Sequence, residues 1–133
     1  MYQNVMKRNA IKELYEWKEN NGRKPLVIFG ARQVGKTWLM KEFGKEAYKK
    51  CAYVNFEDND DLRGLFEHDF DIQRIIANLQ WTTGVTIDED TLIILDEIQE
   101  APRGITALKY FQEKAPQYHV IAAGSLLGIA MHK

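Results

Sequence analysis

The feature of this sequence that most restricts its fold is the string Gly-Ala-Arg-Gln-Val-Gly-Lys-Thr at residues 30–37. It matches G-x-x-x-x-G-K-T, a loop whose backbone N–H groups surround a phosphate. An apolar run at residues 25–29 precedes the string, and a helix-forming stretch at residues 38–43 follows it. This context predicts a phosphate site at the start of a helix, where N–H groups and the helix dipole favour an anion. The alternative, a glycine-rich turn with an exposed lysine, requires a chance match that residue frequencies make rare.

The residues of this predicted nucleotide site have distinct roles. Lys36 would reach the β- and γ-phosphates of the nucleotide, and the Thr37 hydroxyl would bind Mg²⁺. Arg32 and Gln33 could reach phosphate or a neighbouring subunit, or could be solvent-exposed loop residues, and the sequence favours neither. The residues that we expect to contact the nucleotide are Gly30, Ala31, Arg32, Gln33, Val34, Gly35, Lys36, Thr37 and Trp38.

Segments with strand and helix character alternate along the chain. We expect strands at residues 26–29, 52–56, 91–95 and 119–123, and helices at residues 4–20, 36–49, 61–67, 71–81 and 105–114. The continuous apolar run at residues 91–95 is typical of a strand covered on both faces, as in a parallel sheet. The alternation predicts a three-layer α/β fold with a parallel sheet, in one domain that spans residues 1–133.

Composition excludes several other classes. With 133 residues, 45% of them hydrophobic, the chain can bury a core and is not of the disordered class. A formal net charge of −1 gives no general attraction to nucleic acid or to an anionic membrane. We expect a cytoplasmic protein, because no apolar run has transmembrane length and no signal peptide core is visible. A single cysteine excludes an internal disulfide, and the histidines show no zinc-binding pattern.

Polar residues follow the third and fourth predicted strands. Asp96 comes directly after an apolar run, at the edge of the sheet where ligands bind, and can hold Mg²⁺ directly or through water. The next residue, Glu97, could polarise the water that attacks the γ-phosphate, or could cap the following turn; the shared position with Asp96 favours catalysis. Ser125 could touch the γ-phosphate or the attacking water, or could cap a helix that begins at Leu126.

Three strings together resemble a bacterial and archaeal family of AAA-like ATPases with a further C-terminal domain of unknown function. They are residues 30–37, Leu-Asp-Glu-Ile-Gln at residues 95–99, and Ala-Gly-Ser-Leu-Leu-Gly at residues 123–128. The resemblance covers essentially the whole chain. It implies ATP and Mg²⁺ as ligands and a P-loop NTPase sheet of the RecA/AAA type, with strand order 5-1-4-3-2. The fifth strand has no counterpart here, so we expect an N-terminal piece of a longer protein.

The resemblance also implies roles for two polar residues. Ser125 occupies the position called sensor 1 in AAA-type ATPases. Asn55, near the end of the second strand, matches a residue that in some of these ATPases hydrogen-bonds the catalytic glutamate and withholds it. The alternative, an asparagine bonded to nearby backbone, is the interpretation that we favour. No arginine finger or sensor 2 residue can be assigned after Ser125.

Two functions fit these observations. The first is an ATPase that uses Lys36, Glu97 and Ser125 to hydrolyse ATP and to drive or gate an unidentified partner or effector domain. The second is a nucleotide-gated signalling or defence switch with little turnover. A small-molecule kinase fits less well, because such kinases usually lack the Asp-Glu pair and carry an arginine-rich lid. With the fifth strand missing, the first strand would be an edge, so we expect self-association and weak hydrolysis.

Overall fold

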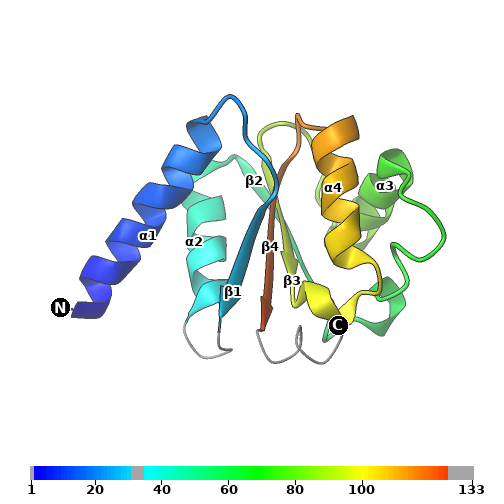
Figure 1. The fold of residues 1–133 in the computed structure, drawn as a ribbon, viewed down its shortest axis with the longest axis horizontal. Coiled ribbons are helices and arrows are strands. Elements are labelled where there is room, and N and C mark those ends of the chain that lie inside the picture. Colours follow the sequence, from blue (N-terminus) through cyan, green and yellow to red (C-terminus); the bar gives the residue numbers. More distant parts are fainter. Residues whose placement is uncertain (1, 31–34, 126–133) are drawn as a thin grey trace.

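The computed structural model describes the backbone of residues 2–30 and 35–125, and side chains from residue 9 onward within these ranges. Four strands alternate with four α-helices (Figure 1). Two single 3-10 turns, η1 and η2, lie between the longer elements. In chain order the elements are α1 (Tyr2–Glu19), β1 (Leu26–Gly30), α2 (Lys36–Ala47), β2 (Lys50–Asn55), η1 (Asp60–Leu62), α3 (Ile72–Thr83), β3 (Thr91–Asp96), η2 (Ile98–Glu100), α4 (Gly104–Lys114) and β4 (His119–Ser125).

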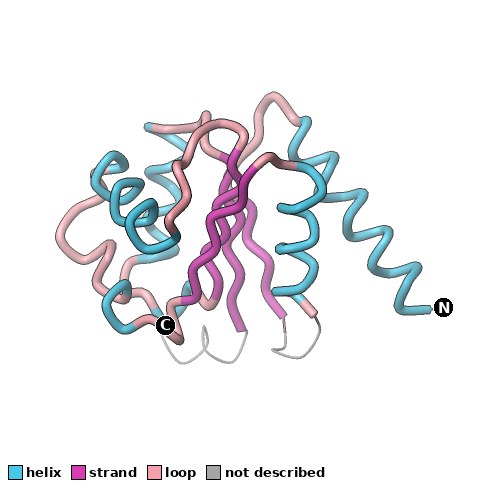
Figure 2. The backbone as a smooth tube through the Cα atoms, turned by 180° about the vertical axis from the view of Figure 1, so that it is seen from behind, coloured by secondary structure: helices cyan, strands magenta, loops and turns pink. Residues whose placement is uncertain are grey.

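The four strands form one parallel sheet in the order β1-β4-β3-β2. Helices α1 and α2 lie on one face of the sheet, and α3 and α4 lie on the other (Figures 1 and 2). This is the three-layer α/β fold that the alternation of elements predicts. Its strand order agrees with the 1-4-3-2 part of the order that the family resemblance implies.

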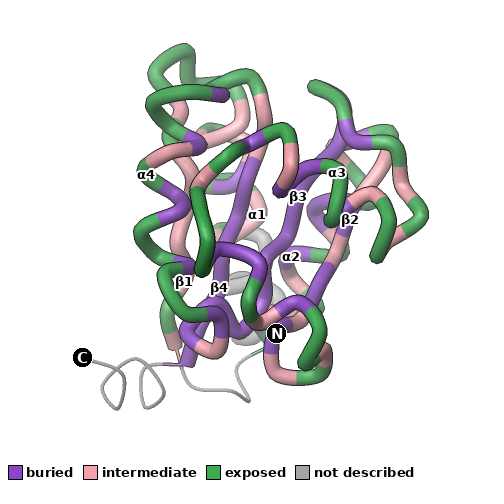
Figure 3. Tube along the Cα trace, turned by 90° about the vertical axis from the view of Figure 1, so that its right-hand side faces the viewer, coloured by how far each residue is buried: buried purple, intermediate pink, exposed green. Residues whose placement is uncertain are grey.

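Strand β3 is the centre of the structure. It pairs with β2 on one side and β4 on the other, and all six of its residues are buried because helices cover both faces of the sheet (Figure 3). Its side chains alternate between two cores: Leu92 and Ile94 face the α1–α2 layer, and Ile93 and Leu95 face the α3–α4 layer. A continuous apolar run therefore serves both faces of the sheet, as expected for an interior parallel strand.

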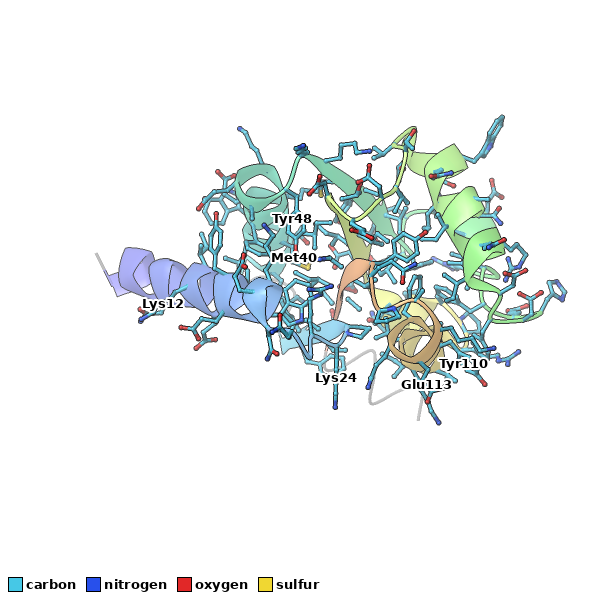
Figure 4. All side chains as sticks on the ribbon, turned by 90° about the horizontal axis from the view of Figure 1, so that it is seen from above. Lys12, Lys24, Met40, Tyr48, Tyr110 and Glu113 are labelled. Carbon is cyan, nitrogen blue, oxygen red and sulfur yellow. The ribbon has the colours of Figure 1, made fainter. Side chains whose placement is uncertain are left out.

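The core beneath α2 is built from aromatic and long apolar side chains. Met40 and Phe43 are fully buried on the inner side of the helix, and Tyr48 follows them at its end. Viewed from above, Met40 and Tyr48 lie on the side of α2 that faces the sheet, whereas Lys12 and Glu113 extend from the outer surfaces of their helices (Figure 4). This packing fixes α2 against the sheet and so fixes the start of the helix, where the predicted phosphate site lies.

Most element boundaries differ from the sequence predictions by one or two residues, and two differences have a clear structural reason. Residues 61–67 do not form the expected helix; they form η1 followed by turns, with i to i+3 bonds such as Leu65 N to Leu62 O at 3.0 Å. The Arg63 guanidinium donates to the carbonyls of Phe56 and Glu57, which ties this segment to the end of β2. Strand β2 begins at Lys50, two residues earlier than predicted, because Lys50 pairs with Thr91 at the start of β3.

Strand β1 lies on the outside of the described sheet. It pairs with β4, and its side chains are partly or largely exposed, with Phe29 at 45%. None of the described helices is long and apolar enough to cross a membrane.

Candidate functional site

The predicted site residues meet at the edge of the sheet formed by the carboxyl ends of the strands. The register places Gly30 opposite Ser125, and Asn55 opposite Asp96. Four predicted residues of the loop, Ala31, Arg32, Gln33 and Val34, lie outside the described residues. The next described residue is Gly35, which directly precedes α2 and has a φ of 79°. A side chain would be strained in this left-handed conformation, which explains the need for glycine here.

Lys36 lies at the centre of this edge. Its side chain is buried, with 6% exposed. The ammonium donates to the carbonyl oxygens of Gly30 at 3.3 Å and Gly124 at 3.1 Å, which are at the ends of two neighbouring strands. It also lies 4.0 Å from Oε1 of Glu97. A buried cation held on backbone carbonyls is positioned to exchange these neutral acceptors for phosphate oxygens.

The two predicted Mg²⁺ ligands are in direct contact. Thr37 Oγ1, in the first turn of α2, donates to Asp96 Oδ2 at 2.6 Å. The carboxyl group of Asp96 is at the end of β3, only 2% exposed, and its Oδ1 accepts from the N–H of Glu97 at 2.9 Å. A hydroxyl and a carboxylate oxygen at one point are the hard donors that Mg²⁺ takes alongside nucleotide phosphates. The residues present therefore fit Mg²⁺.

Glu97 has a backbone conformation that is uncommon for a residue with a side chain. Its φ of 52° and ψ of 49° are left-handed, and its side chain makes no capping hydrogen bond to η2. The carboxylate instead accepts from Ser125 Oγ, at 3.2 Å from each oxygen, and from Gln99 Nε2 at 2.9 Å. Strain of this kind is commonly found at functional sites. The alternative role of Ser125, as a cap for residues 126 onward, lies outside the described residues.

Sequence reasoning missed Tyr53. Its hydroxyl donates to Asp96 Oδ2 at 2.6 Å, so it shares this oxygen with Thr37. Burial raises the pKa of the Tyr53 phenol, and the hydrogen bond and charge of Asp96 raise it further, so the phenol stays protonated and donates at neutral pH. On its other side, the ammonium of Lys41 lies 4.1 Å from the ring centroid. The signal in the sequence was weak: Tyr53 is two residues before Asn55, on the strand that neighbours β3.

The side chain of Asn55 bonds to the nearby backbone. Its Oδ1 accepts from the N–H of Glu57 at 2.8 Å, which shapes the turn that follows β2. This geometry favours the interpretation of Asn55 as an asparagine bonded to nearby backbone over its proposed contact with Glu97.

Trp38 is the last predicted contact of the nucleotide. It follows Thr37 in the first turn of α2 and has 48% of its surface exposed, at the same end of the helix as the phosphate site. The structure therefore brings together Lys36, Thr37, Asp96, Glu97 and Ser125, and it leaves a nucleotide contact by Trp38 as a prediction.

The chain is similar to proteins of known family and structure. Residues 22–133 match the model of a family described as AAA domain. Among solved structures, the one titled "Structure of C. elegans PCH-2" is similar, with 14% identity and a TM-score of 0.47. The match covers 98% of this chain and 38% of that chain, so this chain spans little more than a third of the length of that protein. Because the family model matches most of the chain, the chain belongs to the AAA-domain family.

Proposed function

We propose that this domain binds Mg-ATP at the carboxyl ends of β1, β4 and β3 and hydrolyses it. The observation that carries the proposal is the 2.6 Å contact between Thr37 Oγ1 and Asp96 Oδ2. It joins the phosphate-binding helix to the acidic end of β3, as a shared Mg²⁺ site requires. Membership of the AAA-domain family supports a nucleotide-binding domain of the ATPase type.

Each residue at this edge has a role in the proposal. Lys36 would bind the terminal phosphates, and Thr37 and Asp96 would hold Mg²⁺. When bound, Mg²⁺ supplies positive charge that neutralises the phosphate oxygens. Glu97 would orient the attacking water and accept its proton, and Ser125, which already contacts Glu97, would lie beside the same water.

The contact between Lys36 and Glu97 suggests how nucleotide binding prepares the site. In this structure the ammonium lies 4.0 Å from the carboxylate. Phosphate oxygens carry more charge than the carbonyls that Lys36 now contacts, so they would draw the ammonium toward the nucleotide. That movement withdraws a cation from Glu97 and leaves the carboxylate to the water.

The proposal is tested by two substitutions with opposite outcomes. Lys36→Ala should weaken Mg-ATP binding by about tenfold or more, because it removes a charge-assisted contact to phosphate. Glu97→Gln should retain binding and slow hydrolysis by about 10²-fold or more, the range for a lost general base. Binding is measured by titration with a fluorescent nucleotide, and hydrolysis by phosphate release.

Lys45→Ala is the matched control, since Lys45 is an exposed lysine on the same helix. It should bind and hydrolyse ATP like the parent protein. Unchanged nucleotide affinity in Lys36→Ala would refute the phosphate site, and parental hydrolysis by Glu97→Gln would assign the base elsewhere.

We further propose that hydrolysis drives or gates a partner or effector domain. A switch with little turnover is the second candidate, and it would follow if Lys36 kept its contact with Glu97 while nucleotide is bound. Turnover of about 1 s⁻¹ or faster would indicate a driving role, whereas turnover near 10⁻³ s⁻¹ would indicate the switch.

A further inference from the structure

The carboxylate of Glu97 is held by a buried polar cluster that includes one residue without a role so far. Ser125 Oγ lies 3.2 Å from both carboxylate oxygens, and Lys36 Nζ lies 4.0 Å from Oε1. Among these described contacts the shortest is from Gln99, whose Nε2 donates to Oε2 at 2.9 Å. The proposed function assigns roles to Lys36, Glu97 and Ser125, but not to Gln99.

The orientation of the Gln99 amide follows from its neighbour. With the amide turned around, its oxygen would face the carboxylate, and two acceptors would oppose each other. The donor end therefore faces Glu97. The acceptor end, Oε1, is buried and has no hydrogen-bond partner among the residues that the structure describes. Only 8% of the Gln99 surface is exposed.

A buried amide with one end unpaired does little for the stability of the fold. The hydrogen bond to a carboxylate is favourable, but burial of an unpaired carbonyl oxygen is unfavourable by a comparable amount. An apolar side chain of similar length would fill the same space without this cost. The position of Gln99 is thus better explained by what it does to Glu97 than by packing.

The backbone of η2 gives this contact a fixed geometry. The turn is closed by bonds from the N–H of Glu100 to Glu97 and of Ala101 to Ile98, both at 3.0 Å. Ile98 is fully buried, and α4 approaches it so closely that a Cβ at Gly104 would lie 2.9 Å from its Cδ1. The turn is therefore anchored between the sheet and α4, and it holds the Gln99 side chain against Glu97.

We propose that Gln99 is a positioning residue that orients the Glu97 carboxylate for its contact with the attacking water. The inference rests on the proposed function, because it gives Gln99 its effect through Glu97. Gln99 itself touches neither the phosphates nor Mg²⁺ in this scheme.

The test is Gln99→Met in the whole protein that carries this domain. Methionine keeps the length of the side chain and removes the donor. We expect kcat to fall by about 10- to 10²-fold, the effect of a misplaced catalytic group. The Kd for Mg-ATP should stay within about twofold of the parent value, and the midpoint of thermal unfolding should be unchanged or higher.

The double variant Gln99→Met/Glu97→Gln tells whether Gln99 affects kcat through Glu97 or independently of it. If Gln99 acts through Glu97, adding Gln99→Met to Glu97→Gln should change kcat by less than about twofold. Gln112→Met makes the same chemical change at an exposed position on α4 and should leave every measurement at the parent value. Gln99→Leu is a second variant that also lacks the donor, and it should lose kcat as well.

The outcomes are distinct. Parental kcat in both Gln99→Met and Gln99→Leu would overturn the inference, with the proposed function intact if Glu97→Gln is slow. Parallel loss of nucleotide binding and thermal stability in Gln99→Met would overturn it in favour of a structural role. Parental hydrolysis by Glu97→Gln would overturn the proposed role of Glu97, and the positioning role with it.

Discussion

The hydroxyl of Tyr53 offers a direct measure of how much the Asp96 carboxylate depends on its neighbours. Tyr53→Phe removes one donor at 2.6 Å and leaves the ring in place. A hydrogen bond to a charged group contributes about 1.5–3 kcal/mol. Asp96 keeps its bonds to Thr37 and to the N–H of Glu97, and Tyr53 is only partly buried, so we expect a loss of about 1–2 kcal/mol. For a domain of this size the midpoint of unfolding should fall by about 3–10 °C.

The same substitution should affect the Mg²⁺ site. Asp96 would be oriented less firmly toward Thr37, so half-maximal nucleotide binding should require about 3- to 10-fold more Mg²⁺, equivalent to roughly 1 kcal/mol. Thermal unfolding followed by circular dichroism, and Mg²⁺ titrations with a fluorescent nucleotide, measure the two effects. Tyr110→Phe is the control, because Tyr110 stacks on Phe70 in the opposite layer. A Tyr53→Phe protein with parental stability and Mg²⁺ dependence would refute this reasoning.

Two further predictions concern charge. Asp96→Asn should make nucleotide binding nearly independent of Mg²⁺, measured by the same titration with and without a chelator, and a full Mg²⁺ dependence would argue against Asp96 as a ligand. Burial, with help from Arg23 and Lys18, lowers the pKa of His119 to about 4, below its unfolded value near 6.5. As the pH falls from 6.5 toward 4, the unfolded chain binds a proton at His119 that the folded chain does not, and this favours unfolding. The midpoint of thermal unfolding should therefore drop between pH 7 and 4.5. His119→Gln should show a smaller drop, and an equal drop would assign the pH dependence to other groups.

Sequence reasoning found the candidate site residues that lie next to one another in the chain. The described residues of the first string, Gly30 and residues 35–37, follow an apolar strand, and Asp96 and Glu97 stand at the end of another. Parallel pairing carries such ends to one edge. The strand order came from the family resemblance, and the structure confirms its 1-4-3-2 part.

The residues that sequence reasoning missed depend on geometry that no string encodes. Tyr53 reaches Asp96 because β2 pairs with β3 in a particular register, and a tyrosine in a partly exposed strand has no distinctive pattern by itself. Gln99 contacts Glu97 because Glu97 itself has a left-handed backbone conformation and is followed at once by the tight turn η2. The expected helix at residues 61–67 failed because Arg63 bonds to carbonyls of the preceding loop, a tertiary contact that local propensity does not contain.

The placement of β4 between β1 and β3 has a consequence for how the domain folds. Thr37 and Asp96 are 59 positions apart in the chain, and Lys36 and Gly124 are 88 apart, so no short segment contains the site. Strand β4 must insert between β1 and β3, which precede it in the chain, before these contacts exist, and such distant pairings are slow to form. A ligand that requires them binds the folded chain and not its unfolded ensemble, and it therefore stabilises the whole domain by mass action. If the proposed function holds, nucleotide binding would therefore require β4 to have paired with β1 and β3, and ATP would act as a ligand that stabilises only the folded domain.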